Sequence, residues 1–209
     1  LDHELHFVSS VFAMKQSLQS LLREVRRCRL CEAQLPRGPR PVLQAAPRAR
    51  ILIASQAPGT KVHESGKPFS DASGERLRDW LGIPESVFHD ERRVAIVPMG
   101  FCYPGRGKGG DLPPRPECAA TWRARVLAGL TDLELTLVIG SYAMAWHLPG
   151  AGTNLTDVVM GWRDHWPAVV PLPHPSPRNT PWLRRNPWFE AELVPRLRQR
   201  VSAILDHSR

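Results

Sequence analysis

Four short runs of apolar residues stand out in the pattern of hydrophobic and polar positions along the chain. They occupy residues 51–55, 94–97, 135–139 and 168–172. A continuous apolar run of this length, rich in β-branched residues and bounded by Gly, Pro or polar residues, is typical of a strand buried on both faces. The sequence therefore predicts four buried strands.

Segments with apolar residues at helical spacing separate these runs. We predict helices over residues 11–27, 73–81, 116–130, 140–147 and 186–206. In the last of them, Leu193, Leu197 and Val201 fall on one face. Strands that alternate with helices form a parallel sheet covered on both faces. The expected fold class is α/β, with a three-layer α/β/α arrangement and a central four-stranded parallel sheet, in a single domain over residues 1–209.

The first predicted strand breaks directly into a loop, Ser55-Gln56-Ala57-Pro58-Gly59. In an open α/β sheet, ligands bind in the crevice beyond the carboxyl ends of the strands. Gln56 at this break is therefore a candidate site residue, although an ordinary strand-to-helix turn would have the same composition. Other loops are marked by clusters among the 21 prolines, at residues 36–47, 104–116 and 167–187, which we interpret as ordered and irregular.

Charge narrows the class of partner. Lys and Arg total 28 against 20 for Asp and Glu, which gives a net charge of +8. Such an excess favours a polyanionic partner, nucleic acid before an acidic membrane surface. No apolar run approaches the length of a membrane span, and the first residues have no signal-peptide pattern. We expect a soluble, cytoplasmic monomer that binds nucleic acid and no membrane.

The four cysteines are candidate metal ligands. Cys28 and Cys31 form a C-x2-C step at the end of the first predicted helix, and Cys102 and Cys118 flank a loop rich in Gly and Pro. In a cytosolic protein this usage argues for a metal or redox role over disulfides. Four thiolates suit a tetrahedral zinc ion or a [4Fe–4S] cluster, and the spacing does not choose between them. Four unrelated buried thiols are the structural alternative.

Together these motifs resemble the uracil-DNA glycosylase superfamily, and most closely its iron–sulfur branch of bacteria and archaea. The matching segments, which span nearly the whole chain, are Cys28 and Cys31, Ser55-Gln56-Ala57-Pro58-Gly59, Gly66-Lys67-Pro68-Phe69, Cys102, Cys118 sixteen positions later, and His174-Pro175-Ser176-Pro177-Arg178-Asn179. The resemblance implies a base-excision repair enzyme that acts on DNA in the bacterial nucleoid. It also places a [4Fe–4S] cluster, mainly structural in that family, ahead of zinc on the four cysteines.

The chain also departs from the pattern of that branch. Gln56 stands where the branch has Glu, His63 where it has Asp, and Pro98 where it has an Asn at the end of the second strand. Conversely, Asp71 occupies a position where a small residue is usual. We interpret the chain as a divergent member whose catalytic carboxylate has moved or is dispensed with.

Catalytic roles follow from the resemblance and from the chemistry of base excision. His174, held in a proline-flanked loop, is expected to donate a hydrogen bond to the carbonyl oxygen of the departing base. Asp71, and less strongly His63, could stabilise the sugar cation or orient a water. Gln56 carries no charge, so it could hold a water or the base but not act as a general base. Asp71 could equally cap the helix that begins near Ser73.

Binding roles are assigned to two further groups. Phe69 is the expected stacking surface for a flipped base, unless it is an ordinary core residue, and Gln56, Ala57 and Met99 are placed with it in the base pocket. The expected DNA contacts are Ser176, Arg178, Asn179 and Lys67, with Lys61, Arg106 and Lys108 adding salt-sensitive affinity.

The expected function is a monofunctional uracil-DNA glycosylase that hydrolyses the N-glycosidic bond of uracil and leaves an abasic site, since no Lys is placed for a Schiff base. Three alternatives stay open. The preferred base could be hypoxanthine or xanthine, the chain could be a metal-stabilised DNA-binding module without turnover, or a histidine such as His63 could trap the sugar covalently.

Overall fold

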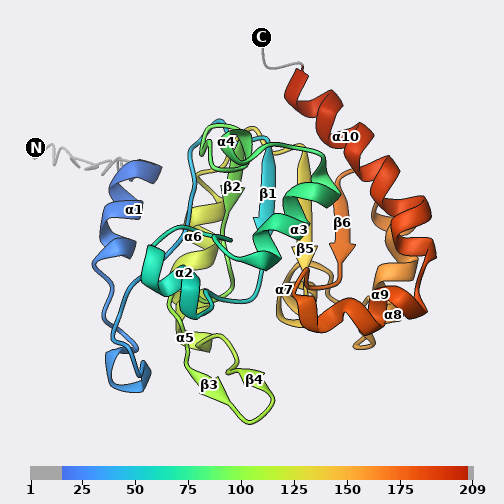
Figure 1. The fold of residues 1–209 in the computed structure, drawn as a ribbon. Helices are drawn as coiled ribbons and strands as arrows, with labels where there is room; N and C mark the ends of the chain where they lie inside the picture. Colours follow the sequence, from blue (N-terminus) through green and yellow to red (C-terminus); the bar gives the residue numbers. More distant parts are fainter. Residues whose placement is uncertain (1–15, 207–209) are drawn as a thin grey trace, which may run out of the picture.

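The computed structural model describes residues 16–206 and contains a four-stranded parallel sheet in the order β2-β1-β5-β6 (Figure 1). The strands are β1 (Ile51–Ala54), β2 (Val94–Ile96), β5 (Leu135–Ile139) and β6 (Val169–Leu172). Ile53 is in register with Ile96 on one side and with Leu137 on the other. Each predicted strand is present within one residue of its expected ends, and the α/β/α fold class is confirmed.

Helices cover both faces of the sheet, because successive strand residues point to opposite sides. Ile51 and Ile53 lie in a core formed with α3 (Ala72–Leu81) and α10 (Val194–Asp206). Leu52 lies in a second core formed with α1 (Leu18–Arg26) and α6 (Ala124–Leu127). Burial on both faces explains why each strand is a continuous apolar run and not an alternating one.

The predicted helices occur near their expected positions, with changes at their ends. Residues 11–15 of the first lie outside the described residues, and α7 (Ser141–His147) matches its prediction closely. The helix expected over 116–130 consists of α5 (Pro116–Cys118), the π-helical segment Ala119–Arg123 and α6, and it ends at Leu127. The last helix begins with the π-helical segment Phe189–Leu193. Among the described residues, no helix combines the length and the apolar character that crossing a membrane requires.

The sequence analysis did not predict several short elements. They are α2 (Thr60–Ser65), α4 (Glu85–Phe88), α8 (Leu155–Met160), α9 (Thr180–Arg185) and the 3-10 segments Glu32–Gln34, Gly161–His165 and Pro177–Asn179. Helices of four to six residues are shorter than the window in which helical periodicity becomes visible.

The proline-rich segment 104–116 is not wholly irregular, contrary to the expectation. Arg106–Gly107 (β3) pairs antiparallel with Gly110–Asp111 (β4), so that Lys108 and Gly109 form the turn of a hairpin. Its glycines have low strand propensity and concealed it in the sequence. In Figure 1 the hairpin lies beyond the end of the sheet to which the strand arrowheads point.

A fully buried arginine ties the helical layer to the end of β2. Nη1 of Arg123 donates to the carbonyl oxygens of Val97 and Pro98, each at 2.9 Å, and Nη2 lies 2.5 Å from Nε2 of His147. Burial lowers the pKa of Arg123 to about 10 and that of His147 to about 4. At neutral pH the guanidinium is therefore charged and the imidazole is neutral, so Nε2 accepts. This network fixes the backbone that follows β2.

Candidate active site

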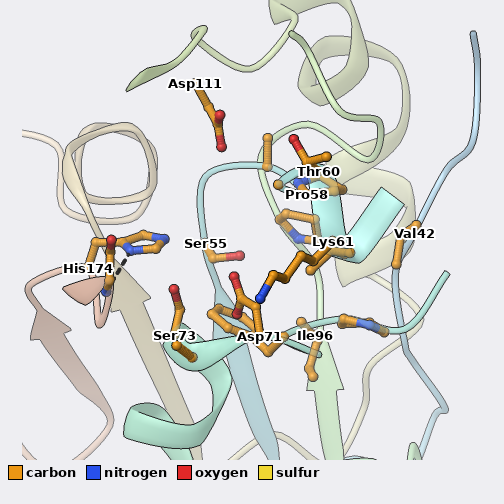
Figure 2. Close-up of a pocket in the computed structure, with 18 of the residues that line it drawn as sticks. Val42, Ser55, Pro58, Thr60, Lys61, Asp71, Ser73, Ile96, Asp111 and His174 are labelled. Atoms are coloured by element: carbon orange, nitrogen blue, oxygen red, sulfur yellow. Dashed lines mark hydrogen bonds between the residues drawn. The ribbon is translucent and has the colours of Figure 1, made fainter. Parts of the chain in front are cut away.

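A pocket of about 350 Å³ opens at the carboxyl ends of the strands (Figure 2). Its walls are the loop after β1, the turn before α3, the β3–β4 hairpin and the loop after β6. Eight of the candidate binding and catalytic residues named from the sequence line it: Ala57, Lys61, Phe69, Asp71, Arg106, His174, Ser176 and Arg178. The pocket therefore lies where the crevice rule for open α/β sheets predicts a ligand site.

Phe69 lines this pocket while it is also packed into the core. Its side chain is 8% exposed, and its ring meets the ring of Phe88 edge to face at a centroid distance of 6.0 Å. Its backbone has φ of 52°, a left-handed value that is uncommon for a bulky side chain. A Cβ built at Gly74 would lie 1.8 Å from the Phe69 carbonyl oxygen. The first turn of α3 thus presses directly on the Phe69 backbone and fixes the ring in place.

Asp71 both caps a helix and lines the pocket, as the two interpretations of the sequence allowed. It is the N-cap of α3, and its Oδ1 accepts a hydrogen bond from the backbone N–H of Gly74 at 3.2 Å. It also lines the pocket, where its carboxylate and the ring of His174 face a common space (Figure 2). Capping engages one carboxylate oxygen and therefore restrains how the group can move.

The hydrogen bonds of His174 fix its tautomer. Nδ1 accepts from the backbone N–H of Ser176 at 3.1 Å, so in the neutral ring the proton is on Nε2. Burial lowers the pKa of His174, while the nearby carboxylates of Asp71 and Asp111 oppose that shift. His174 is therefore a neutral imidazole at neutral pH, with an Nε2–H available as a donor.

Two polar side chains hold the loop that carries His174. The side-chain amide of Asn179 donates to the His174 carbonyl oxygen at 2.8 Å. Arg76 on α3 donates to the carbonyl oxygen of Ser176 at 3.1 Å and to the hydroxyl of Thr180 at 3.2 Å. Asn179 thus stabilises the loop through this hydrogen bond and does not line the pocket. The DNA contact expected of it from the sequence stays a prediction.

Five other predicted residues also lie outside the pocket lining, and one of them, Lys108, is in the turn of the hairpin. Gln56 is partly buried, and its carbonyl oxygen accepts from Gly100 at 3.0 Å, while Met99 lies in the main core. Lys67 forms an ion pair with Glu85 at 2.5 Å. His63 is buried on α2, and its Nδ1 has no hydrogen-bond partner among the described residues. Burial and the neighbouring Arg40 and Arg37 lower the pKa of His63.

The pocket contains an acid that sequence reasoning missed. Asp111, at the end of the hairpin, lines it together with the basic residues Lys61, Arg106 and Arg178. The hairpin was expected to be an irregular loop, so nothing indicated which of its side chains faces the sheet. An acidic residue among the glycines and basic residues of 105–111 was the available signal.

All four cysteines line a second, smaller pocket, with Pro39, Pro41 and Phe101 in its wall. All are free thiols. Within residues 16–206, no three His, Cys, Asp or Glu side chains are already arranged as the ligands of one metal ion. The structure thus gathers residues from the segment after α1, the loop after β2 and α5, which are distant in sequence, around one space.

Hydrogen-bond donors point at the cysteine sulfurs. The indole N–H of Trp122 donates to Cys28 at 3.2 Å, and the backbone N–H of Phe101 donates to Cys118 at 3.3 Å. The Arg115 side chain and the Arg40 backbone N–H act as donors toward Cys31 and Cys102. Burial nevertheless raises the pKa of Cys102 to about 11 and that of Cys118 to about 12. N–H donors aimed at buried sulfurs fit thiolates that are bound to a metal centre.

The contact between Gly74 and Phe69 gives a direct test of the site geometry. Gly74→Ala should lower the free energy of unfolding by about 1–3 kcal/mol, because its Cβ cannot coexist with the Phe69 carbonyl oxygen. Gly109→Ala is the matched control, since a Cβ there meets nothing within 4 Å, and it should change stability by less than about 0.5 kcal/mol. Denaturant unfolding measures both, and equal stability of the two variants would contradict the described packing.

Comparison with known families identifies the chain. A model of the uracil DNA glycosylase superfamily matches residues 43–198, a range that includes the loops bearing Phe69, Asp71 and His174 as well as Cys102 and Cys118. Cys28 and Cys31 precede the matched range. The chain belongs to the uracil DNA glycosylase superfamily, which implies a hydrolase of N-glycosyl bonds that acts on DNA.

Proposed function

We propose that the chain is a monofunctional uracil-DNA glycosylase that flips uracil out of DNA and hydrolyses its N-glycosidic bond to leave an abasic site. The observation that carries the proposal is the neutral His174, whose Nε2–H is left as a donor in a pocket that also contains Phe69. The proposed setting is the DNA of a bacterial nucleoid, on which the protein acts as a monomer.

In the proposed reaction, the flipped base enters the pocket and its face stacks on Phe69. As the C1′–N1 bond breaks, negative charge develops on the base and concentrates on its carbonyl oxygens. His174 donates its Nε2–H to one of these oxygens and stabilises the leaving group, in the manner of an oxyanion hole. A neutral donor suits this task because it needs no proton from solvent at neutral pH.

The remaining proposed site residues act around this centre. The carboxylate of Asp71 faces the pocket and could stabilise the cationic sugar with the oxygen that does not cap α3. Ala57 contributes to the wall of the base pocket. The backbone of Gln56 and Met99 takes part in the hydrogen bonds that join the loop after β1 to the loop after β2. His63 is buried on α2.

Basic residues at the rim would hold the DNA. Arg178, Lys61 and Arg106 line the pocket, where they can contact phosphates and give salt-dependent affinity without sequence preference. Ser176 is part of the same rim. Lys67 is in an ion pair with Glu85, so it would have to exchange that partner for a phosphate.

A glycosylase for another deaminated base is the second candidate, and Pro98 is the observation that favours it. Pro98 lines the pocket, has no N–H, and its carbonyl oxygen accepts from Arg123. The position where the related branch has an Asn therefore offers no donor to uracil. Recognition of hypoxanthine or xanthine would depend on other walls of the same pocket.

We also propose that Cys28, Cys31, Cys102 and Cys118 hold a [4Fe–4S] cluster, with zinc as the alternative. The converging thiols and their N–H donors support a metal centre. When bound, such a cluster would supply a structural crosslink between the N-terminal helix and the loop after β2.

Excision assays test the proposed activity. The chain should convert uracil-containing oligonucleotides into alkali-labile products, while His174→Ala and Phe69→Ala should lower the single-turnover rate constant about 100-fold or more. Asp164→Asn, on a 3-10 segment outside the pocket lining, serves as the control. Because Lys61 lines the pocket, borohydride trapping should accompany the assay, and a trapped adduct would contradict the monofunctional mechanism. Full activity of the folded His174→Ala variant would contradict the proposed role of the imidazole.

The pH dependence of excision should follow from the lowered pKa of His174. The neutral ring is the proposed active form, so the single-turnover rate should hold as pH falls through the ordinary histidine pKa near 6.5 and decline only at lower pH. Protonation would place a hydrogen on Nδ1, which then could no longer accept from Ser176. A rate that instead rises as pH is lowered through 6.5 would make the imidazolium the active donor.

Metal analysis tests the cysteine site. The purified full chain should contain about four irons and matching sulfide, with visible absorbance that is lost in Cys102→Ser. That variant should also unfold at a lower temperature, because a metal that binds only the folded chain stabilises it. One zinc per chain without iron would support the alternative, and a chain that binds neither metal would leave four buried thiols.

A further inference from the structure

The β3–β4 hairpin brings a second carboxylate to the pocket, opposite Asp71. Figure 2 shows the Asp111 side chain directed into the space that His174 and Asp71 also face. Its Oδ2 lies 3.5 Å from where a Cβ would stand at Gly59, so the carboxylate is placed over the turn that follows β1. This is the loop in which the related iron–sulfur branch has Glu and the present chain has Gln56.

The hairpin is held in this position by contacts at both of its ends. The backbone N–H of Leu112 donates to the carbonyl oxygen of Gly105 at 2.9 Å and closes the hairpin. Gly110 has φ of 140°, and a Cβ there would lie 2.6 Å from Nη1 of Arg178. The Arg178 guanidinium therefore packs on the hairpin backbone and links it to the loop that carries His174.

The two pocket carboxylates differ in how they are engaged. Asp71 caps α3 with Oδ1. The Asp111 side chain has no hydrogen bond or ion pair in the part of the chain that the structure describes, although Arg106 and Arg178 line the same pocket. Both carboxylates act electrostatically on His174. Asp111 is therefore the pocket carboxylate whose two oxygens are both available to bind a water.

An unpaired carboxylate is unfavourable for DNA binding itself, because it repels phosphates in a site otherwise ringed by Lys61, Arg106 and Arg178. The Asp111 carboxylate would instead stabilise two species in base excision. One is the sugar, which becomes positively charged as the base leaves, and the other is the water that attacks it.

From this geometry we infer that Asp111 is the catalytic carboxylate of this chain, supplied by the hairpin in place of the motif acid that Gln56 replaces. The inference rests on the proposed glycosylase function. The bond between C1′ and the base nitrogen breaks, and its electron pair leaves with the base, stabilised by His174. A water oxygen then bonds to C1′ while Asp111 accepts the water proton, which passes to solvent. The base nitrogen takes up a proton from solvent, so the sum is the addition of one water across the glycosidic bond.

Single-turnover excision with the full chain tests the role of Asp111. Asp111→Asn should lower the rate constant at least about 100-fold with little change in affinity for a uracil oligonucleotide. Added formate should restore part of the rate of Asp111→Ala, since a small carboxylate can occupy the vacated space.

Two matched variants make the result specific. Asp71→Asn removes a charge from the same pocket while keeping an N-cap, because Asn caps as well as Asp, and it should retain more of the rate than Asp111→Asn does. Asp132→Asn removes an exposed carboxylate in the loop before β5 and should leave the rate unchanged.

The outcomes separate this inference from the proposed function. A rate for Asp111→Asn within threefold of the unmodified chain would overturn the inference while leaving the glycosylase in place. Loss of folding or of DNA binding in Asp111→Asn, without formate rescue of Asp111→Ala, would make the residue structural and overturn it as well. If the unmodified chain excised no base from any oligonucleotide, the function and the inference would both fail.

Discussion

The site depends on the parallel register of the four strands. Because β1, β2, β5 and β6 run in one direction, the loops that follow them converge at a single edge of the sheet. Asp71 and His174, about one hundred residues apart in sequence, meet there only because β1 and β6 are both paired with β5. The apolar pairing at the centre of the sheet therefore sets the spacing of polar groups at its edge.

Backbone contacts then make the edge rigid. Phe69 is held by Gly74, His174 is oriented by the N–H of Ser176, and the loop after β6 is tied to α3 through Arg76. In the proposed reaction, a donor with a fixed tautomer and a ring with a fixed backbone would need little rearrangement when a base enters. Such preorganisation is the usual source of transition-state stabilisation in polar active sites.

The two pockets share one stretch of backbone. Pro98 lines the base pocket, and Cys102, four residues later, lines the cysteine pocket. Between them Gly100 donates to Gln56 and Phe101 donates to the Cys118 sulfur, while Arg123 holds the carbonyl oxygens before them. The wall of the larger pocket and the cysteine pocket are therefore built on one continuous segment, residues 97–102.

The sequence alone determined the four strands and the long helices, because burial on both faces produces continuous apolar runs and because Pro and Gly mark the strand ends. It also predicted that ligands bind at the carboxyl edge of the sheet, where the structure has a pocket. It also picked out Phe69, Asp71 and His174. Only the tertiary structure decided that Asn179 and Lys67 are engaged elsewhere, that Gln56 and Met99 lie outside the pocket lining, and that Asp111 faces it. Those outcomes depend on which way a loop side chain points, and this is set by contacts between residues far apart in the chain, such as Arg178 with Gly110, that leave no local periodicity to detect.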